Sequence, residues 1–341
     1  MANELIPVVD FSAYRLDRNV PDEAKFPLLI TEVYKAFSKI GFVYLVNTGI
    51  PSKIVSTFSS PTTADVRCGE HSDYGGITLL FQDSQGGLEA QEHGISEEFL
   101  GSLHSVFTYA VQLHQRILEV LARGLQLQVQ LSIYILYSKT VLKIQAQEHG
   151  ISEEFLGSLH SVFTYAVQLH QRILEVLARG LQLQDPMMLV NAHKLIGKEG
   201  NVSALRSLFY PPPSDFPTKA GQVRCGEHSD YGGITLLFQD SQGGLEVKNL
   251  NGDFVAASPI ENAVIVNVGD LMQRWTADKL VSTKHRVLMP FDTEKPNQIR
   301  QSMAFFGHPD SEEQIVCIDG SNKYPPVGSL EYLNYRFSVT Y

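Results

Sequence analysis

Short apolar runs separated by turn residues fill the C-terminal part of the chain. From residue 205 onward, hydrophobic stretches of strand length alternate with Gly, Pro, Asn and Asp, a pattern typical of strands joined by tight turns. The pattern predicts eight strands, at residues 205–210, 234–238, 244–247, 253–257, 263–268, 285–289, 300–306 and 315–318. A set of short strands such as this favours a jelly roll.

Two longer stretches have the 3.6-residue period of amphipathic helices. Residues 22–39 place apolar side chains on one face, and Gly41 follows them as a stop signal. A second helix is predicted within residues 146–184, with Ser152 as its N-cap and Gly180 at its end. Its apolar stripe comprises Phe155, Leu159, Val162, Phe163, Ala166, Leu169, Ile173 and Leu177. We therefore expect a mainly β fold with flanking helices.

Two segments of the chain occur twice. Residues 66–89 are identical to residues 223–246 over 24 positions, and residues 90–128 are identical to residues 146–184 over 39 positions. The offsets are 157 and 56, whereas a solenoid or an old domain duplication would have one fixed period and diverged copies. This pattern is typical of recent exon duplication with shuffling, or of a faulty gene model.

These patterns divide the chain into four regions. We predict an N-terminal region (1–58), an anomalous block with the duplicated segments (59–145), a backing helix with its connection (146–204) and a jelly-roll domain (205–341). Within the anomalous block, Val129 to Gln145 alternates apolar and mixed residues in a strand-like manner, and we assign this stretch no function.

Composition narrows the class of protein. The net charge of -10 and the lack of a basic stripe argue against nucleic-acid binding, and no run approaches the 18 apolar residues of a membrane span. The N-terminus lacks a basic region followed by an apolar one, so we expect no secretory signal. Cys68, Cys225 and Cys317 form no disulfide framework, which favours a reducing compartment. We therefore expect a soluble, cytoplasmic protein that binds neither nucleic acid nor membrane, and we also expect it to be a monomer.

The candidate chemistry lies in the predicted β domain. His228 and Asp230 precede an apolar strand, and residues i and i+2 of a strand share a face, so we expect both side chains to project together. With His285 from a distant strand they would complete a 2-His-1-carboxylate facial triad, which is typical of non-haem iron(II). Arg300 and Ser302 form a second i, i+2 pair that can hold a carboxylate.

The order His-x-Asp, distant His and Arg-x-Ser resembles the 2-oxoglutarate and iron(II) dependent dioxygenases, in particular the isopenicillin N synthase branch. The resemblance covers roughly residues 1–58 and 146–341. Further short segments that are similar to segments of this family are Ile6–Asp10, Gly41–Tyr44, Asn47–Ile50, Asn267–Asp270, Gln273–Trp275 and His285–Val287.

This resemblance implies a double-stranded β-helix (jelly roll, cupin-like) core with an N-terminal helical region. It implies iron(II) on His228, Asp230 and His285, with 2-oxoglutarate as cosubstrate and dioxygen as oxidant; ascorbate is a candidate reductant. Arg300 and Ser302 would bind the far carboxylate of 2-oxoglutarate, and Tyr210 matches a tyrosine that hydrogen-bonds the keto-acid. The implied reaction hydroxylates or desaturates a small organic substrate while 2-oxoglutarate is decarboxylated to succinate.

Two alternatives stay open. The chain could be an oxidase of the same branch that does not consume 2-oxoglutarate, like isopenicillin N synthase or the ethylene-forming oxidase, because those relatives also carry an Arg-x-Ser pair. It could instead be a non-catalytic product of a rearranged gene, since the block after Pro51 replaces the helices and loops that normally cover the barrel mouth.

Other histidines are expected to bind no catalytic metal. The duplicate pair His71 and Asp73 has no second His at the spacing that separates His228 from His285. We expect His193 and His308 at turns, and we expect the histidines of the duplicated helix, which are His104, His114, His160 and His170, to be packed residues rather than ligands.

Overall fold

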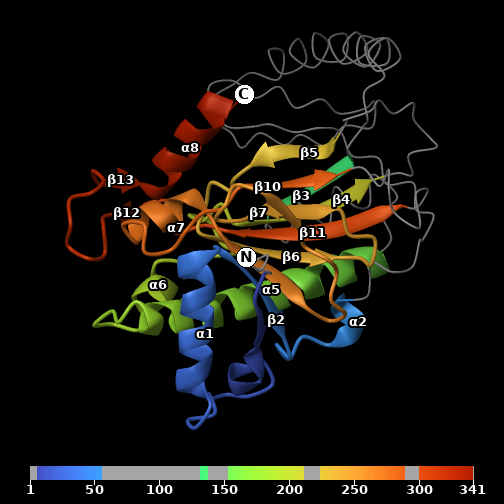
Figure 1. Ribbon diagram of the computed structural model, residues 1–341, viewed down its shortest axis with the longest axis horizontal. Coiled ribbons are helices and arrows are strands. Elements are labelled where there is room, and N and C mark those ends of the chain that lie inside the picture. The colour runs from blue at the N-terminus through green and yellow to red at the C-terminus, as the bar shows by residue number, and fades with distance from the viewer. Residues whose placement is uncertain (1–5, 56–130, 137–152, 211–222, 289–298, 341) are drawn as a thin grey trace, which may run out of the picture.

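The computed structural model describes residues 6–55, 131–136, 153–210, 223–288 and 299–340 (Figure 1). This part of the chain is mainly β with flanking helices, as predicted. The largest sheet has the order β1 (Val8–Asp10), β2 (Phe42–Val46), β9 (Val264–Val268), β6 (Ile234–Gln239), β11 (Arg300–Gly307), β4 (Ala204–Tyr210) and β3 (Leu131–Leu136). A smaller sheet has the order β5 (Val223–His228), β10 (His285–Leu288), β7 (Leu245–Lys248) and β8 (Phe254–Ala256).

The two faces of the large sheet pack against different partners. In β6, Ile234, Leu236 and Phe238 belong to the core that also contains the buried residues of the helices, whereas Leu237 packs with residues of the smaller sheet. Because successive side chains of a strand point to opposite faces, Thr235 lies on the same face as Leu237. The polar residue Thr235 therefore lies on the face of the large sheet that is turned toward the smaller sheet.

Two helices cover the other face of the large sheet. Figure 1 shows α1 (Phe26–Lys39) and α5 (Glu153–Gly180) together on one side of the strands, with the blue and green ribbons crossing. The predicted stripe of α5 is buried from Leu159 to Leu177, as its period indicates. Ser152 and the side chain of Phe155 lie outside the described residues. The pattern of the sequence thus predicted this layer.

Gly180 is the last residue of α5. Its lack of a side chain is required by close packing and not by a left-handed backbone conformation. A Cβ at Gly180 would lie 2.8 Å from Cβ of Tyr34 on α1, a distance that real Cβ atoms do not adopt. The left-handed residue of this turn is Gln182, with φ 58°. Gly180 therefore lets α1 approach α5, and Gln182 reverses the chain.

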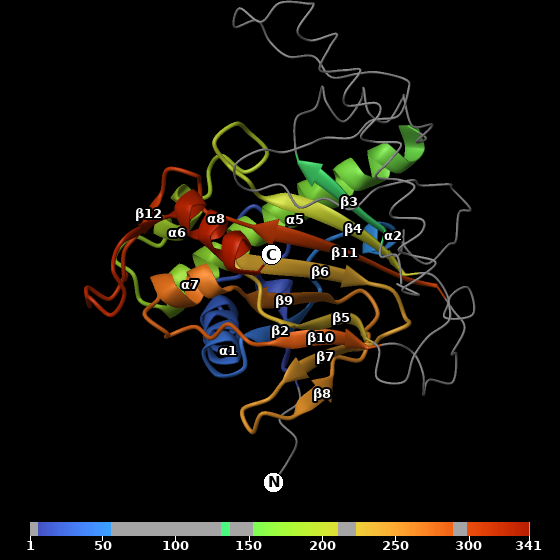
Figure 2. The same ribbon diagram turned by 90° about the horizontal axis from the view of Figure 1, so that it is seen from above.

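A second core fills the space between the sheets. It includes Phe42, Tyr44 and Ile265 from the large sheet with Val247 and Val287 from the smaller one. Figure 2 shows β5, β10, β7 and β8 stacked beside the strands of the large sheet. Sheets that pack face to face around an apolar core in this way form the jelly roll that the strand pattern predicted.

The strand predictions agree with the structure except at three places. All eight predicted strands are present, although β12 (Gln314–Ile315) is shorter than expected. We did not predict β5 as a separate strand, because its sequence Val-Arg-Cys-Gly-Glu-His carries little apolar alternation. The short strand β13 (Val327–Gly328), which pairs with β12, was also missed. The strand-like stretch Val129 to Gln145 contains β3, which pairs with β4 in antiparallel fashion.

The short helices occupy the connections. They are the 3-10 helix η1 (Phe11–Tyr14), α2 (Ser52–Val55), α6 (Met188–Asn191), α7 (Asp270–Trp275) and α8 (Ser329–Thr340). The helix α8 contains Tyr332 and Leu333, and Leu333 is buried. In the described part of the chain, no helix is long and apolar enough to cross a membrane.

The predicted region boundaries at residues 58, 145 and 204 stay predictions. Strands from both sides of them share the large sheet, since β1, β2 and β3 pair in it with strands of the C-terminal half. The first copies of the duplicated segments, at 66–89 and 90–128, lie outside the described residues, and so do His71 and Asp73.

Candidate metal and cosubstrate site

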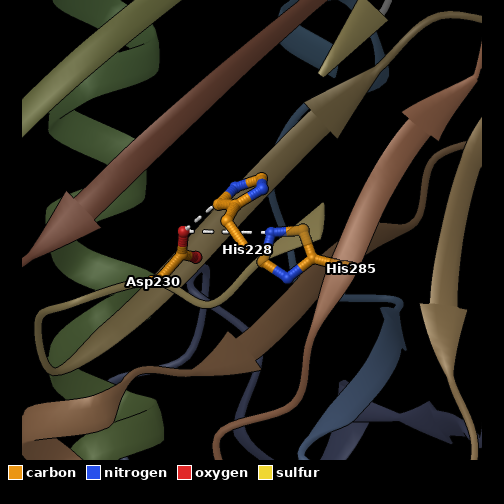
Figure 3. A group of neighbouring side chains, drawn as sticks. All are labelled: His228, Asp230 and His285. Carbon is orange, nitrogen blue, oxygen red and sulfur yellow. Dashed lines mark ion pairs between the residues drawn. The ribbon is translucent and has the colours of Figure 1, made fainter. Parts of the chain in front are cut away.

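Three potential metal ligands converge between the sheets. The Nε2 atoms of His228 and His285 lie 4.0 Å and 3.9 Å from Oδ1 of Asp230, and Figure 3 shows the three side chains pointing toward one another. One ligand atom from each residue lies within 4.8 Å of the others. Among the described residues this is the one group of three or more His, Cys, Asp or Glu side chains with such geometry.

The three residues come together in a different way from the one we expected. His228 is the last residue of β5, and Asp230 lies in the connection to β6 rather than two positions along the same strand. His285 faces His228 directly in the antiparallel β5–β10 pair, with ring centroids 4.3 Å apart. Asp230 is held by a backbone hydrogen bond from N of Asp270 to its carbonyl oxygen, 2.7 Å long. Turn geometry therefore brings the carboxylate to the histidine pair.

Backbone carbonyls orient both imidazole rings. Nδ1 of His228 lies 2.8 Å from the carbonyl oxygen of Gly226, and Nδ1 of His285 lies 3.1 Å from that of Thr283. A carbonyl oxygen only accepts hydrogen bonds, so each Nδ1 carries a proton, and in the neutral ring the lone pair is then on Nε2, the atom nearest the other ligands. This is the tautomer that a metal requires of its histidine ligands.

Two buried hydrogen bonds occupy one oxygen of the Asp230 carboxylate. Oδ2 accepts from Oγ1 of Thr235 at 2.6 Å and from Nδ2 of Asn267 at 2.7 Å. Oδ1 is thereby left facing the two histidines. Two nitrogen lone pairs and one carboxylate oxygen on one side of a site fit iron(II), whose facial triads have this composition with open positions opposite.

The pKa values reflect this crowding. Burial raises the pKa of Asp230, but His285, His228 and the two hydrogen bonds outweigh burial and lower that pKa below its usual value. Burial lowers the pKa of His285, and the Asp230 carboxylate offsets only part of this effect. For His228, burial also lowers the pKa, but the hydrogen bond with Cys225 and the Asp230 charge raise it to about 9. The carboxylate is therefore charged at neutral pH.

The predicted cosubstrate residues lie on the same face of the large sheet. Arg300 and Ser302 on β11 are buried, and Arg300 is paired in register with Tyr210 on β4. Nη1 of Arg300 donates to Oγ of Ser302 at 3.1 Å, and its Nε donates to the carbonyl oxygen of Gly243 at 2.7 Å. The guanidinium carbon of Arg300 lies 5.1 Å from the Tyr210 ring centre. The structure brings these three residues together, and their roles stay predictions.

Comparisons with known proteins agree with this geometry. Residues 187–309 match the model of the 2OG-Fe(II) oxygenase superfamily. This segment, which contains His228, Asp230, His285, Arg300 and Ser302, is therefore similar to that superfamily. The 2-oxoglutarate-Fe(II) type oxidoreductase ppzD of Metarhizium rileyi is 35% identical over 183 residues, which are 51% of this chain and 50% of the relative. Proline hydroxylase buaE of Petromyces alliaceus is 39% identical over 168 residues, 48% of either protein. The chain thus spans about half the length of these curated relatives.

A solved structure extends the similarity to the whole fold. A full-length Neurospora crassa protein, crystallised in complex with alpha-KG, has a TM-score of 0.66 and 26% identity, covering 100% of this chain and 98% of that one. The predicted family is therefore confirmed at the level of the superfamily, and its jelly-roll core is shared. The isopenicillin N synthase branch stays a prediction.

Asp270 connects the loops that surround the triad. Its carboxylate accepts hydrogen bonds from Ser229, next to Asp230, and from Ser282, near His285. It also pairs with Arg336 on α8. These contacts of Asp270 and the burial of Trp275 indicate that both residues support the structure around the site.

Three further histidines gather behind the Asp230 loop. His170 on α5 and His193 after α6 have ring centroids 5.1 Å apart, and both are completely buried. His308 follows β11 and is 9% exposed, and a Cβ at Gly232 would lie 2.3 Å from its Nδ1. As expected, His193 lies in a turn and His170 packs in the core. His308 directly follows β11 and does not lie in a turn, and His160, which we expected to be packed, is exposed. Burial lowers the pKa of each of the three.

Sequence reasoning missed three residues of the site. Thr235 and Asn267, which hold Asp230, are polar positions inside otherwise apolar strands, and that interruption was a usable signal. Arg224 on β5 is only 7% exposed and its guanidinium carbon lies 5.3 Å from the Tyr210 ring centre. A buried arginine cannot be recognised from a strand whose alternation is this weak.

Proposed function

We propose that this chain is a 2-oxoglutarate and iron(II) dependent dioxygenase that oxidises a small organic substrate. The observation that carries the proposal is the convergence of His228, Asp230 and His285 on one side of an inter-sheet space whose other wall holds Arg300 and Ser302. A metal triad and a buried carboxylate-binding pair on facing sheets are the two parts that such an enzyme needs.

Each part has a separate task. Bound iron(II) would supply the oxidising chemistry, using dioxygen and the decarboxylation of 2-oxoglutarate to succinate and carbon dioxide. Thr235 and Asn267 keep Oδ1 of Asp230 directed at the metal position, because they occupy the other oxygen. Arg300 and Ser302 would orient the cosubstrate by its far carboxylate, since a buried guanidinium pairs strongly with a carboxylate. The apolar core between the sheets excludes water from this space.

The substrate class follows from the relatives only in outline. One relative is named as a proline hydroxylase, and hydroxylation of a small molecule is the corresponding proposal for this chain. We further propose a cytoplasmic monomer, a proposal supported by the free Cys225 and Cys317 and by the acidic net charge.

Anaerobic spectroscopy tests the proposal. Iron(II) followed by 2-oxoglutarate should produce a visible metal-to-ligand charge-transfer band, because a chelated keto-acid offers a low-lying acceptor orbital. His285→Ala should abolish the band, whereas His160→Ala, on the exposed side of α5, should keep it. An undiminished band in His285→Ala would refute the proposal that His285 is the third iron ligand.

Dioxygen uptake separates this function from the related oxidase. Consumption that depends on added 2-oxoglutarate supports the dioxygenase. Uptake of equal rate without 2-oxoglutarate would favour an oxidase of the isopenicillin N synthase type. Iron binding with no uptake under either condition would favour a non-catalytic protein.

A further inference from the structure

Arg224 is a buried cation that forms no salt bridge in the described part of the chain. Its residue is 7% exposed, and its Nε and Nη2 atoms are buried with no hydrogen-bond partner. No carboxylate of the described residues forms a salt bridge with it, in contrast to Arg286 on β10, which pairs with Glu246 at 2.7 Å. An isolated buried charge is costly, so an unpaired guanidinium in this position calls for a ligand.

A local irregularity of β5 directs this side chain into the site. The β5–β10 pairing shifts register on both sides of Val287, whose partner is Cys225. Cys225 packs on the core between the sheets, and its neighbour Arg224 reaches the Tyr210 ring on the facing sheet. Consecutive residues of a regular strand point to opposite faces, and a bulge removes that restriction. Arg224 therefore enters the inter-sheet space from the side that carries His228.

Two guanidinium groups flank the same tyrosine. The carbon Cζ of Arg224 lies 5.3 Å from the centre of the Tyr210 ring, and Cζ of Arg300 lies 5.1 Å from it. Arg224 comes from the smaller sheet and Arg300 from the large one, so the pair is set across the space in which the cosubstrate is proposed to bind. Burial and the charge of Arg300 lower the pKa of Arg224 to about 10, so both groups stay protonated at neutral pH.

The acidic group that acts on both arginines is already engaged in hydrogen bonds. Asp240 acts electrostatically on both arginines, but its carboxylate accepts hydrogen bonds from the backbone N–H groups of Gln242 and Gln301 and forms no salt bridge with either arginine in the described part of the chain. The two guanidinium groups therefore repel each other in the ligand-free protein. An entering anion would relieve this repulsion and fill unused N–H donors at the same time.

We propose that Arg224 is a second carboxylate-binding residue of the site and that it shares the far carboxylate of the dicarboxylate cosubstrate with Arg300. The proposal rests on the proposed function and adds a reason why the site would select a keto-acid that has a second carboxylate. A keto-acid with a second carboxylate gains two charged contacts from facing sheets, whereas a keto-acid with an apolar tail leaves two cations unpaired.

Binding of two keto-acids to the iron(II)-loaded protein, kept anaerobic, tests this role by calorimetry. The probes are 2-oxoglutarate and 2-oxobutyrate, which lacks the second carboxylate. Arg224→Met should lower the affinity for 2-oxoglutarate at least tenfold and leave the affinity for 2-oxobutyrate unchanged. Arg224→Lys should retain part of the affinity for 2-oxoglutarate because a positive charge remains. Arg286→Met is the matched control from the same sheet, and it should bind both probes like the parent protein.

Thermal unfolding separates binding from a structural role. Removal of an unpaired buried charge should raise the Tm of ligand-free Arg224→Met, whereas Arg286→Met should lower it through loss of the Glu246 pair and of stacking on Phe254. An unchanged 2-oxoglutarate affinity, an equal loss for both probes, or a lowered Tm in Arg224→Met would overturn the inference. A parent protein that binds no 2-oxoglutarate would instead contradict the proposed function.

Discussion

Thr235 donates a hydrogen bond of 2.6 Å from Oγ1 to Oδ2 of Asp230, and both residues are buried. This contact, with that of Asn267, determines which oxygen of the carboxylate remains available to a metal. Groups that orient a ligand in this way commonly contribute one to two orders of magnitude to metal affinity. Thr235 and Asn267 should therefore affect metal affinity although neither is a metal ligand.

Thr235→Val should weaken iron(II) binding by about 10- to 100-fold, because valine has nearly the same shape but lacks the hydroxyl. Competition against a coloured chelator under anaerobic conditions measures the change. Thr235→Ser keeps a hydroxyl and should restore most of the affinity. Equal iron affinity in the valine variant and the parent protein would show that Asn267 alone orients the carboxylate.

Arg300→Ala should raise the KM for 2-oxoglutarate strongly. The change removes a charge-assisted contact from a residue that is 1% exposed, and truncation of one partner of such a buried pair costs about 2 to 5 kcal/mol. Arg300→Lys should rescue only part, because lysine cannot form the planar fork. Steady-state kinetics at varied 2-oxoglutarate concentration provide the measurement. An unchanged KM in Arg300→Ala would refute the proposal that Arg300 binds the carboxylate of 2-oxoglutarate.

Acid should destabilise the fold through His170, His193 and His308. Burial lowers the pKa of His193 and of His308 to about 4 and that of His170 well below its usual value, whereas an unfolded histidine titrates near 6.5. Above pH 6.5 neither state gains protons, so this stability is fully present. Between pH 6.5 and 4 the unfolded chain takes up three more protons, and the free energy of unfolding should fall by up to about 4 kcal/mol per pH unit.

Urea unfolding at a series of pH values measures this slope. His170→Leu should reduce it by about one proton, or about 1.4 kcal/mol per pH unit, because one titrating group is removed. A slope that is the same in His170→Leu as in the parent would mean that this ring does not titrate in the unfolding transition.

Two glycines of α5 should respond oppositely to alanine. Gly180→Ala places a Cβ 2.8 Å from Cβ of Tyr34, and the resulting overpacking should destabilise the protein by about 1 to 3 kcal/mol. Gly157→Ala meets nothing within 4 Å and should stabilise the helix by about 0.5 to 1 kcal/mol. Chemical denaturation compares the two variants with the parent. Similar effects of both changes would contradict the close approach of α1 and α5.

The sequence by itself determined most of the elements and indicated the family. The 3.6-residue period of α1 and α5 and the short apolar runs of the C-terminal half are local patterns, and local patterns predict which residues form a helix or a strand. The order of His228, Asp230, His285, Arg300 and Ser302 also lies along the chain. Both kinds of information can be read without knowing how the strands pair.

Only the tertiary structure decided how these residues meet. The register that sets His285 opposite His228, the turn that returns Asp230 to them, and the bulge that aims Arg224 at Tyr210 each depend on contacts between distant strands. Thr235 and Asn267 reach Asp230 because β6 and β9 are adjacent in the sheet. Strand alternation is a property of one segment, whereas register, bulges and the stacking of two sheets are set by the packing of many segments together, and no single stretch of sequence encodes them.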